Sequence, residues 1–211
     1  MLRITEIFYS LQGETSRVGL PTTFVRLTGC PLRCGYCDTS YAFSGGELMN
    51  IDVVINQVAL FSPHYVTVTG GEPLAQAGAL PLLEKLCDHG YSVSLETSGA
   101  LDISQVDKRV SRIVDIKTPG SGEVKKNNWK NLECLTARDE LKFVLCHEND
   151  YHWAKKIMRD HNLDQICPIL FSPVFQQLDP AKLAAWILQD KLPVRLQLQL
   201  HKLIWGECAG K

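Results

Sequence analysis

The sequence predicts an α/β fold in which parallel strands wrap part of the way around a barrel. First, short β-branched segments alternate with segments of helical spacing, a pattern typical of parallel sheets. Second, glycine and polar residues follow most of the expected strands, where ligands bind in such sheets. Third, the chain has 211 residues. A complete eight-unit barrel usually takes about 250 residues, so we expect an incomplete barrel of about six core strands.

The individual elements follow from local patterns. Strands are expected at 22–28, 65–69, 91–97, 112–117, 140–145, 166–173 and 194–200, and helices at 51–61, 74–90, 150–162 and 179–190. Asn50 or Asp52 is placed to cap the first helix, Gly90 ends the second, and Pro180 stands in the first turn of the last. No repeat or linker divides the chain, so residues 1–211 are expected to form one domain.

The composition is that of an ordinary soluble globular protein. Hydrophobic residues make up 45% and charged residues 21%, and the formal net charge is −1. This balance argues against a nucleic-acid partner, which would require a broad basic surface. No apolar run approaches the roughly 18 residues that a membrane span needs, and residues 1–10 lack the apolar stretch of a signal peptide. We therefore expect a cytoplasmic protein without a membrane partner.

The segment GCPLRCGYCD, residues 29–38, places Cys30, Cys34 and Cys37 directly after the first expected strand. A structural zinc site closes with four ligands, so zinc would need a distant fourth ligand such as His201. Disulfides do not suit three cysteines in one loop of a cytosolic chain. Three thiolates can instead hold three irons of a 4Fe-4S cluster and leave the fourth iron open for a bound molecule. The other five cysteines are expected to be buried core thiols: Cys87, Cys134, Cys146, Cys167 and Cys208.

Three further features point to binding. The segment TVTGGEP, residues 67–73, places two glycines after a strand, although a tight turn alone would explain them. Arg26 lies within an apolar strand, and its planar fork suits a carboxylate; an ion pair with Glu14 or Glu96 is the alternative. Thr39 offers a hydroxyl oxygen beside the last loop cysteine, and Mg²⁺ prefers oxygen ligands. A turn hydrogen bond is the ordinary use of such a threonine.

The spacing C-x3-C-x2-C, with Tyr36 before the last cysteine, resembles the cluster loop of radical S-adenosylmethionine enzymes, and TGGEP resembles their glycine-rich segment. LQGE (11–14), VRLTGCPLRCGYCDT (25–39), ETSG (96–99) and QLHK (199–202) add a closer resemblance, to the 7-carboxy-7-deazaguanine synthase family. It covers residues 5 to about 205. The family converts 6-carboxy-5,6,7,8-tetrahydropterin into 7-carboxy-7-deazaguanine and releases ammonia, on the route to queuosine. The reaction starts when a 5′-deoxyadenosyl radical takes a hydrogen atom from substrate C6.

This resemblance implies an incomplete barrel, a homodimer, and three cofactors: one 4Fe-4S cluster on Cys30, Cys34 and Cys37, S-adenosylmethionine, and Mg²⁺ on Thr39. A small electron donor such as flavodoxin or ferredoxin would reduce the cluster. The substrate site would consist of Leu11, Gln12, Gly13, Glu14, Arg26 and Thr97. The S-adenosylmethionine site would consist of Tyr36, Asp38, Gly70, Gly71, Glu72, Gly99, Lys117, Lys142, Ser172, Pro173, Val174 and Phe175. No catalytic side chain is implied, because the cofactors carry the radical chemistry.

Two other functions remain open from the sequence. A short radical enzyme can be an activase that makes a glycyl radical on a partner protein, which requires a groove for a peptide. A non-catalytic iron–sulfur or zinc module is the second alternative, and it would have no use for TGGEP. Segment 203–211 follows the QLHK motif, and no contact is assigned to it.

Overall fold

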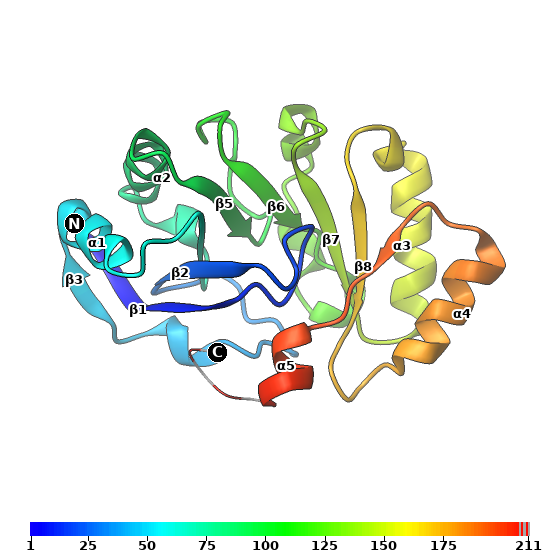
Figure 1. Ribbon diagram of the computed structural model, residues 1–211. Helices are drawn as coiled ribbons and strands as arrows, with labels where there is room; N and C mark the ends of the chain where they lie inside the picture. Colours follow the sequence, from blue (N-terminus) through cyan, green and yellow to red (C-terminus); the bar gives the residue numbers. More distant parts are fainter. Residues whose placement is uncertain (207, 209, 211) are drawn as a thin grey trace.

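A curved nine-stranded sheet forms the centre of the computed structural model, which describes residues 1–206, 208 and 210 (Figure 1). The order across the sheet is β3-β1-β2-β4-β5-β6-β7-β8-β9. The strands are β1 Leu2–Leu11, β2 Pro21–Leu27, β3 Glu47–Met49, β4 Tyr65–Gly70, β5 Ser92–Thr97, β6 Ser111–Asp115, β7 Glu140–Leu145, β8 Ile169–Pro173 and β9 Arg195–Leu196.

The pairing confirms the predicted architecture. All neighbours from β2 to β9 are parallel, and β2 with β4–β8 supplies the six expected core strands. Two strands were not predicted: β1 pairs antiparallel with β2, and the short β3 pairs antiparallel with the beginning of β1. They extend the sheet beyond its first parallel strand.

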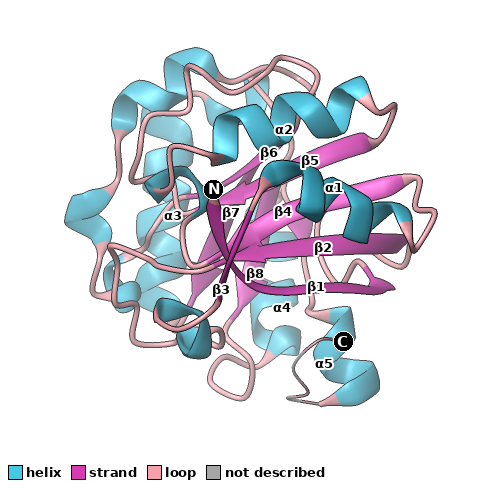
Figure 2. Cartoon of the chain, turned by 90° about the vertical axis from the view of Figure 1, so that its left-hand side faces the viewer, coloured by secondary structure: helices cyan, strands magenta, loops and turns pink. Residues whose placement is uncertain are grey.

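Four helices cover the outer side of the curved sheet, and a fifth lies apart from them at its open side (Figures 1 and 2). The helices are α1 Ile51–Ala59, α2 Ala79–Asp88, α3 Glu148–Asp160, α4 Pro180–Asp190 and α5 Leu200–Trp205. The described residues also form six 3-10 helices: η1 Ser40–Phe43, η2 Pro73–Ala75, η3 Pro119–Ser121, η4 Val124–Lys126, η5 Trp129–Cys134 and η6 Leu163–Gln165. None of the helices in the described part of the chain is long and apolar enough to cross a membrane.

The two faces of the parallel strands differ in chemistry because successive side chains point to opposite sides. On β2, Val25 and Leu27 are fully buried in the hydrophobic core beneath the outer helices, whereas Arg26 lines a cavity on the inner face. On β4, Val68 belongs to the core and Thr69 to the cavity wall. The outer face thus stabilises the sheet by burying apolar side chains, and the inner face is left polar.

A buried ion pair fixes the middle of the sheet. Arg112 on β6 donates from Nε and Nη2 to Asp139 at 3.0 and 2.6 Å, and both side chains are at most 9% exposed. Thr136 also donates to this carboxylate from its backbone and its hydroxyl. These donors outweigh the effect of burial and hold the pKa of Asp139 below its ordinary value. Removing one partner of such a pair typically costs about 3–5 kcal/mol.

Two expected elements differ from the structure by more than a shift of their ends. The helix expected at 74–90 is divided into η2 and α2, because Glu72 caps a separate turn at Pro73 by accepting from the Leu74 amide at 2.9 Å. The strand expected at 194–200 was wrong beyond its first residues. Gln197 still donates to Phe171 of β8, but the chain then leaves the sheet, and Leu200 donates to Gly13 after β1. The segment from Gln197 to α5 therefore spans the gap between the two ends of the sheet (Figure 1).

Candidate active site

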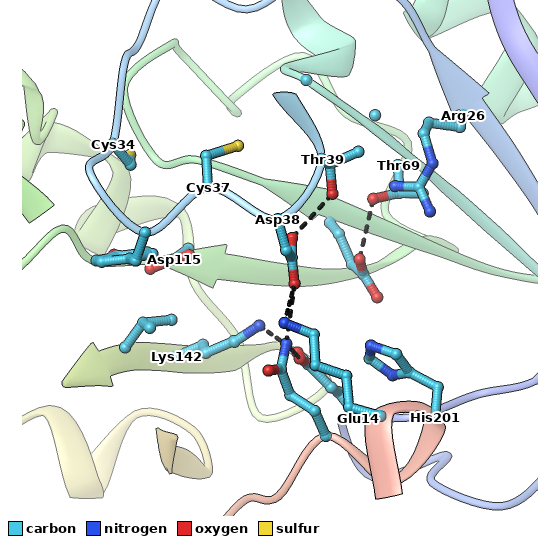
Figure 3. A pocket seen from close by; sticks show the side chains of 18 of the residues that line it. Glu14, Arg26, Cys34, Cys37, Asp38, Thr39, Thr69, Asp115, Lys142 and His201 are labelled. Carbon is cyan, nitrogen blue, oxygen red and sulfur yellow. Dashed lines mark hydrogen bonds and ion pairs between the residues drawn. The ribbon is translucent and has the colours of Figure 1, made fainter. Parts of the chain in front are cut away.

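A cavity of about 770 Å³ opens at the carboxyl ends of the parallel strands. Its wall combines inner-face side chains, the loops that follow the strands, residues of α5, and Gly206, Cys208 and Gly210. Figure 3 shows side chains from these elements pointing toward one space. The volume falls in the range of about 300–1,000 Å³ that is usual for small-molecule and cofactor sites.

Cys30, Cys34 and Cys37 all line this cavity, on the loop that follows β2. Backbone hydrogen bonds fix the loop at both ends: Gly29 donates to Ala42 at 2.8 Å, and Gly35 donates to Ser121 at 3.1 Å. The loop is therefore anchored to two neighbouring segments, and its three thiols are presented to one space.

The chemistry of this set fits an iron–sulfur cluster. Burial raises the pKa of the Cys30 and Cys34 thiols, so their thiolates need a nearby cation to persist. Within the described residues no three His, Cys, Asp or Glu side chains converge as ligands of a single metal ion. The zinc alternative therefore lacks a ready site in this part of the chain, whereas thiols spaced around one cavity suit a larger group.

The glycine pair after β4 packs against the base of the cysteine loop. A Cβ on Gly71 would lie 2.3 Å from the Gly29 carbonyl oxygen and 2.8 Å from Cys30 Cβ. Gly70 has a φ of +153° and would place a Cβ 2.2 Å from the Leu27 carbonyl oxygen. No side chain fits at either position, so both glycines are needed for the strand-end loops to approach each other.

Glu72, expected in the S-adenosylmethionine site, has a different position. Its side chain is fully buried and does not line the cavity. The carboxylate accepts from Thr97 Oγ1 at 3.0 and 2.9 Å, and from the Ser98 amide at 2.7 Å and the Ser98 hydroxyl. These donors and the Leu74 amide occupy the oxygens of Glu72. Glu72 therefore links the loop after β4 to the end of β5 from outside the cavity.

Three other predicted residues also lie off the cavity wall: Gly99, Ser172 and Pro173. Gly99 packs against the Asp115 carbonyl oxygen, and its own carbonyl accepts from Asn128 and Asn131. Ser172 is buried within β8 beside Val144. The remaining predicted residues do line the cavity: Leu11, Gln12, Gly13, Glu14, Arg26, Tyr36, Asp38, Thr39, Gly70, Gly71, Thr97, Lys117, Lys142, Val174 and Phe175.

The loop after β1 brings Glu14 into contact with Lys142 of β7 on the far side of the cavity (Figure 3). Gln199 Nε2 also donates to Glu14, at 2.9 Å. Burial disfavours the charged form of Glu14, but Lys142 and Gln199 outweigh it, and the pKa of Glu14 lies below its ordinary value. Burial also opposes the charge on Lys142, yet Glu14 and Asp115 raise the pKa of Lys142. Both groups are therefore charged at neutral pH.

Arg26 forms an ion pair, but with neither of the residues considered from the sequence. Its Nε donates to Glu6 at 2.6 Å, and its guanidinium carbon lies 5.8 Å from the Phe8 ring centre and 5.9 Å from that of Tyr41. Within the described chain this is the only hydrogen bond of the Arg26 guanidinium. The two terminal nitrogens thus remain for a ligand in the cavity.

The sequence reasoning missed several residues of the cavity wall. Glu96 accepts from Gln12 at 3.2 Å and from Thr69 at 2.9 Å, and burial, together with the charge of Glu14, raises its pKa. Asp115 pairs with Lys117 at 2.8 Å, but its other oxygen and the Tyr36 hydroxyl are buried and have no hydrogen-bond partner among the described residues. The sequence signal for Glu96 and Asp115 was their place at the carboxyl ends of expected strands, where they alternate with core residues. Two unsatisfied polar atoms in one cavity wall fit a polar ligand.

Segment 199–202 closes the opposite side of the cavity. Lys202 pairs with Asp38 at 2.8 Å, and Gln199 Nε2 lies 3.3 Å from the same carboxylate. His201 packs on Gly13, where a Cβ would lie 2.0 Å from its Nδ1. Burial lowers the pKa of His201, which keeps the imidazole neutral at pH 7. The sequence offers His201 only as a distant zinc ligand, and it does not predict that Gln199, His201 and Lys202 line the cavity.

Thr39 stands immediately before η1 and lines the cavity, and its hydroxyl donates to Asp38 at 2.9 Å (Figure 3).

The expectation for the other cysteines is only partly met. Cys146 and Cys167 are buried, Cys87 and Cys134 are partly exposed, and Cys208 is exposed and lines the cavity.

Comparisons with known proteins agree with this geometry. Residues 24–118 match the model of the radical SAM superfamily. The 7-carboxy-7-deazaguanine synthase of Chlorobaculum tepidum is 50% identical over 97% of this chain and 94% of its own length. That of Koribacter versatilis is 44% identical over 97% of both chains. The crystal structure of QueE from Escherichia coli has the same fold, with a TM-score of 0.77 at 23% identity over 95% of this chain and 94% of its own. The chain belongs to the 7-carboxy-7-deazaguanine synthase family of radical S-adenosylmethionine enzymes.

Proposed function

We propose that this chain is a carbon–nitrogen lyase that converts 6-carboxy-5,6,7,8-tetrahydropterin into 7-carboxy-7-deazaguanine with release of ammonia. One observation carries the proposal: a single cavity joins the three-thiol loop and the glycine pair to Arg26, Gln12 and Glu14. The first group of residues suits the radical cofactors, and the second suits a small polar acid. The activase alternative would need a peptide groove here, whereas segment 199–202 lies across the cavity.

Cys30, Cys34 and Cys37 would hold the 4Fe-4S cluster. The residues that would hold S-adenosylmethionine are Tyr36, Asp38, Gly70, Gly71, Lys117, Lys142, Val174 and Phe175, all on the cavity wall. This wall would be supported by four residues that lie outside the cavity: Glu72, Gly99, Ser172 and Pro173. When bound, the reduced cluster and S-adenosylmethionine supply the 5′-deoxyadenosyl radical that takes the hydrogen atom from substrate C6.

The chain's own contribution is to bind and orient the substrate in an enclosed, polar site. Arg26 would take the substrate carboxylate with its two terminal nitrogens, since Glu6 already holds its Nε. Leu11, Gln12, Gly13 and Glu14 would hold the pterin, and Thr97 would lie at its ring edge. Thr39 would bind Mg²⁺ beside the cluster loop, where the ion can also meet substrate oxygens.

Several wider features belong to the same proposal. Residues 1–211 would act as one domain, because one sheet and one core run from β1 to β9. The protein would work in the cytoplasm as a homodimer and receive electrons from a small carrier such as flavodoxin or ferredoxin.

Light scattering of the cluster-loaded protein tests the homodimer, because it measures the mass of the protein in solution. The mass of a monomer would contradict the homodimer.

Cysteine variants test the cluster ligands. Alanine at Cys30, Cys34 or Cys37 should strongly reduce iron and sulfide after anaerobic reconstitution, because each change removes one of three thiolates. Cys167→Ala is the matched control, since Cys167 is buried in the core, away from the cavity. Full iron content in Cys34→Ala, or loss of iron from folded Cys167→Ala, would contradict the assignment.

Arg26 is expected to bind the substrate carboxylate through paired hydrogen bonds. Arg26→Ala should weaken binding of the carboxytetrahydropterin by about 2–5 kcal/mol, and Arg26→Lys should also be impaired because it loses the fork. Glu6→Gln is the control, since it removes the partner's charge but keeps the guanidinium. Wild-type kcat/KM in Arg26→Lys would show that the fork is not used. Equal losses in Arg26→Lys and Glu6→Gln would make Arg26 structural.

Thr39 is expected to act through its oxygen. Thr39→Ala should abolish stimulation of turnover by added Mg²⁺ while iron content and S-adenosylmethionine binding remain. Thr39→Ser, which keeps the hydroxyl, should retain much of the stimulation. If Thr39→Ala responds to Mg²⁺ as the wild type does, the hydroxyl only makes its turn hydrogen bond.

Isotope transfer tests the function itself. The reconstituted protein is incubated with S-adenosylmethionine, a reductant and carboxytetrahydropterin deuterated at C6. We expect 7-carboxy-7-deazaguanine and ammonia, with deuterium in S-adenosylmethionine recovered after many turnovers, because the cofactor is regenerated. Deuterium only in free 5′-deoxyadenosine, equal in amount to product, would make S-adenosylmethionine a co-substrate. Deuterium in neither compound would contradict a radical reaction on this substrate.

A further inference from the structure

The outer side of the cysteine loop carries an unpaired positive charge. Arg33 is exposed between Cys30 and Cys34. Its Nη1 donates to the backbone oxygens of Cys30 and Leu32 at 2.8 and 2.7 Å, and its guanidinium carbon lies 4.3 Å from the Phe43 ring centre. These contacts are all neutral, so the charge of Arg33 is fixed in place beside a cluster ligand and is not cancelled.

A second basic segment is attached to the same loop. Glu123 accepts from the Arg33 amide at 2.6 Å, and the Ser121 carbonyl accepts from the Gly35 amide at 3.1 Å. η4 begins directly after Glu123 and presents Lys125 and Lys126, both exposed.

The resulting surface is locally basic. In the described part of the chain, no carboxylate forms an ion pair with Arg33, Lys125 or Lys126. Even when the charge of Glu123 is counted, this surface is positive, on a chain whose formal net charge is −1. A local field of this kind attracts an oppositely charged partner and raises its rate of association.

The position of this surface suggests what the partner does. The three cysteines line the cavity that the proposed function assigns to S-adenosylmethionine and substrate. The exposed side of the loop, which carries Arg33 and lies off the cavity wall, is then the side left for a protein partner. Reduction of a cluster is a brief encounter, and complexes of redox proteins are typically small and weak. Charge complementarity then supplies orientation and speed without a large apolar interface.

We propose that Arg33, Lys125 and Lys126 form the docking surface for an acidic one-electron carrier protein that reduces the cluster. This inference rests on the proposed function only in requiring a reducible cluster. Lys125 and Lys126 have no part in the cavity, which makes them suitable for charge reversal. Lys108 and Arg138 provide a matched control, because they are exposed and stand before β6 and β7, at the amino ends of the strands.

The experiment measures reduction of the cluster by stopped-flow absorbance, without the pterin. Lys125→Glu/Lys126→Glu is compared with Lys108→Glu/Arg138→Glu, using a reduced flavodoxin or dithionite. At low salt we expect the Lys125→Glu/Lys126→Glu variant to lose about tenfold or more in the second-order rate constant with flavodoxin. For this variant, the decrease of the rate constant with rising ionic strength should also become weaker or turn into an increase. The control variant should behave as wild type, and dithionite should reduce every variant equally.

A binding measurement separates docking from electron transfer. Titration with oxidised flavodoxin, followed by broadening of its NMR signals, should show weaker binding only for the Lys125→Glu/Lys126→Glu variant. Equal losses in both variants would attribute the effect to net charge and overturn the proposal. An unchanged rate constant and unchanged binding in the Lys125→Glu/Lys126→Glu variant would also overturn it. Failure of the pterin assay would leave these measurements unaffected and would bear only on the proposed substrate.

Discussion

Residue 72 holds together the three strand ends on which the site depends. Its amide donates to the Gly29 carbonyl at the base of the cysteine loop, at 2.8 Å. Its carboxylate accepts from Thr97 and Ser98 at the end of β5. Hydrogen bonds to a buried carboxylate are among the stronger ones, and leaving its donors without it would expose several unsatisfied groups. The contact also explains the two glycines before it, because only a turn without side chains lets residue 72 approach Gly29.

Paired charges on the cavity wall are the second organising feature. Glu14 pairs with Lys142, and Asp38 with Lys202, so each of these acids keeps its charge despite its surroundings. Among the described residues Glu96 forms no ion pair, and burial together with the charge of Glu14 raises its pKa. A wall of fixed, paired charges is already oriented before a ligand enters, so little reorganisation is needed when the ligand binds. A polar ligand with charges of both signs is suited to this wall.

The sequence was sufficient for the parallel part of the fold, because β-branched segments and helical periodicity alternate clearly from residue 22 onward. It was not sufficient for β1, which pairs antiparallel with β2 and β3 and carries mixed polar residues, or for segment 194–200. Residues 194–200 have the alternating pattern of a strand. In the structure, however, Gln199 donates to Glu14 and Leu200 donates to Gly13 instead of pairing in the sheet. Long-range competition of this kind leaves no local signal.

The candidate site was predicted to a similar degree. The cysteine loop, the glycine pair and Arg26 were found because their spacing or their place in an apolar strand is unusual. Glu72 was expected in the S-adenosylmethionine site, whereas its carboxylate accepts from Thr97 and Ser98 and lies off the cavity wall. Sequence order does not tell which way a carboxylate points. The partners of Asp38 and Glu14 lie far along the chain, at Lys202 and Gln199, and only the folded arrangement brings them together.

The segment that closes the gap in the barrel has a consequence for how the protein is made. Gln199 and Glu14 are 185 positions apart in the chain, yet their side chains are joined by a hydrogen bond in the cavity wall. During synthesis the cysteine loop, the glycine turn and most of the sheet emerge from the ribosome well before Gln199 does. Contacts of such high sequence separation are entropically costly and form late in folding. The cysteine loop and the glycine turn can therefore form before Gln199 completes the wall of the cavity.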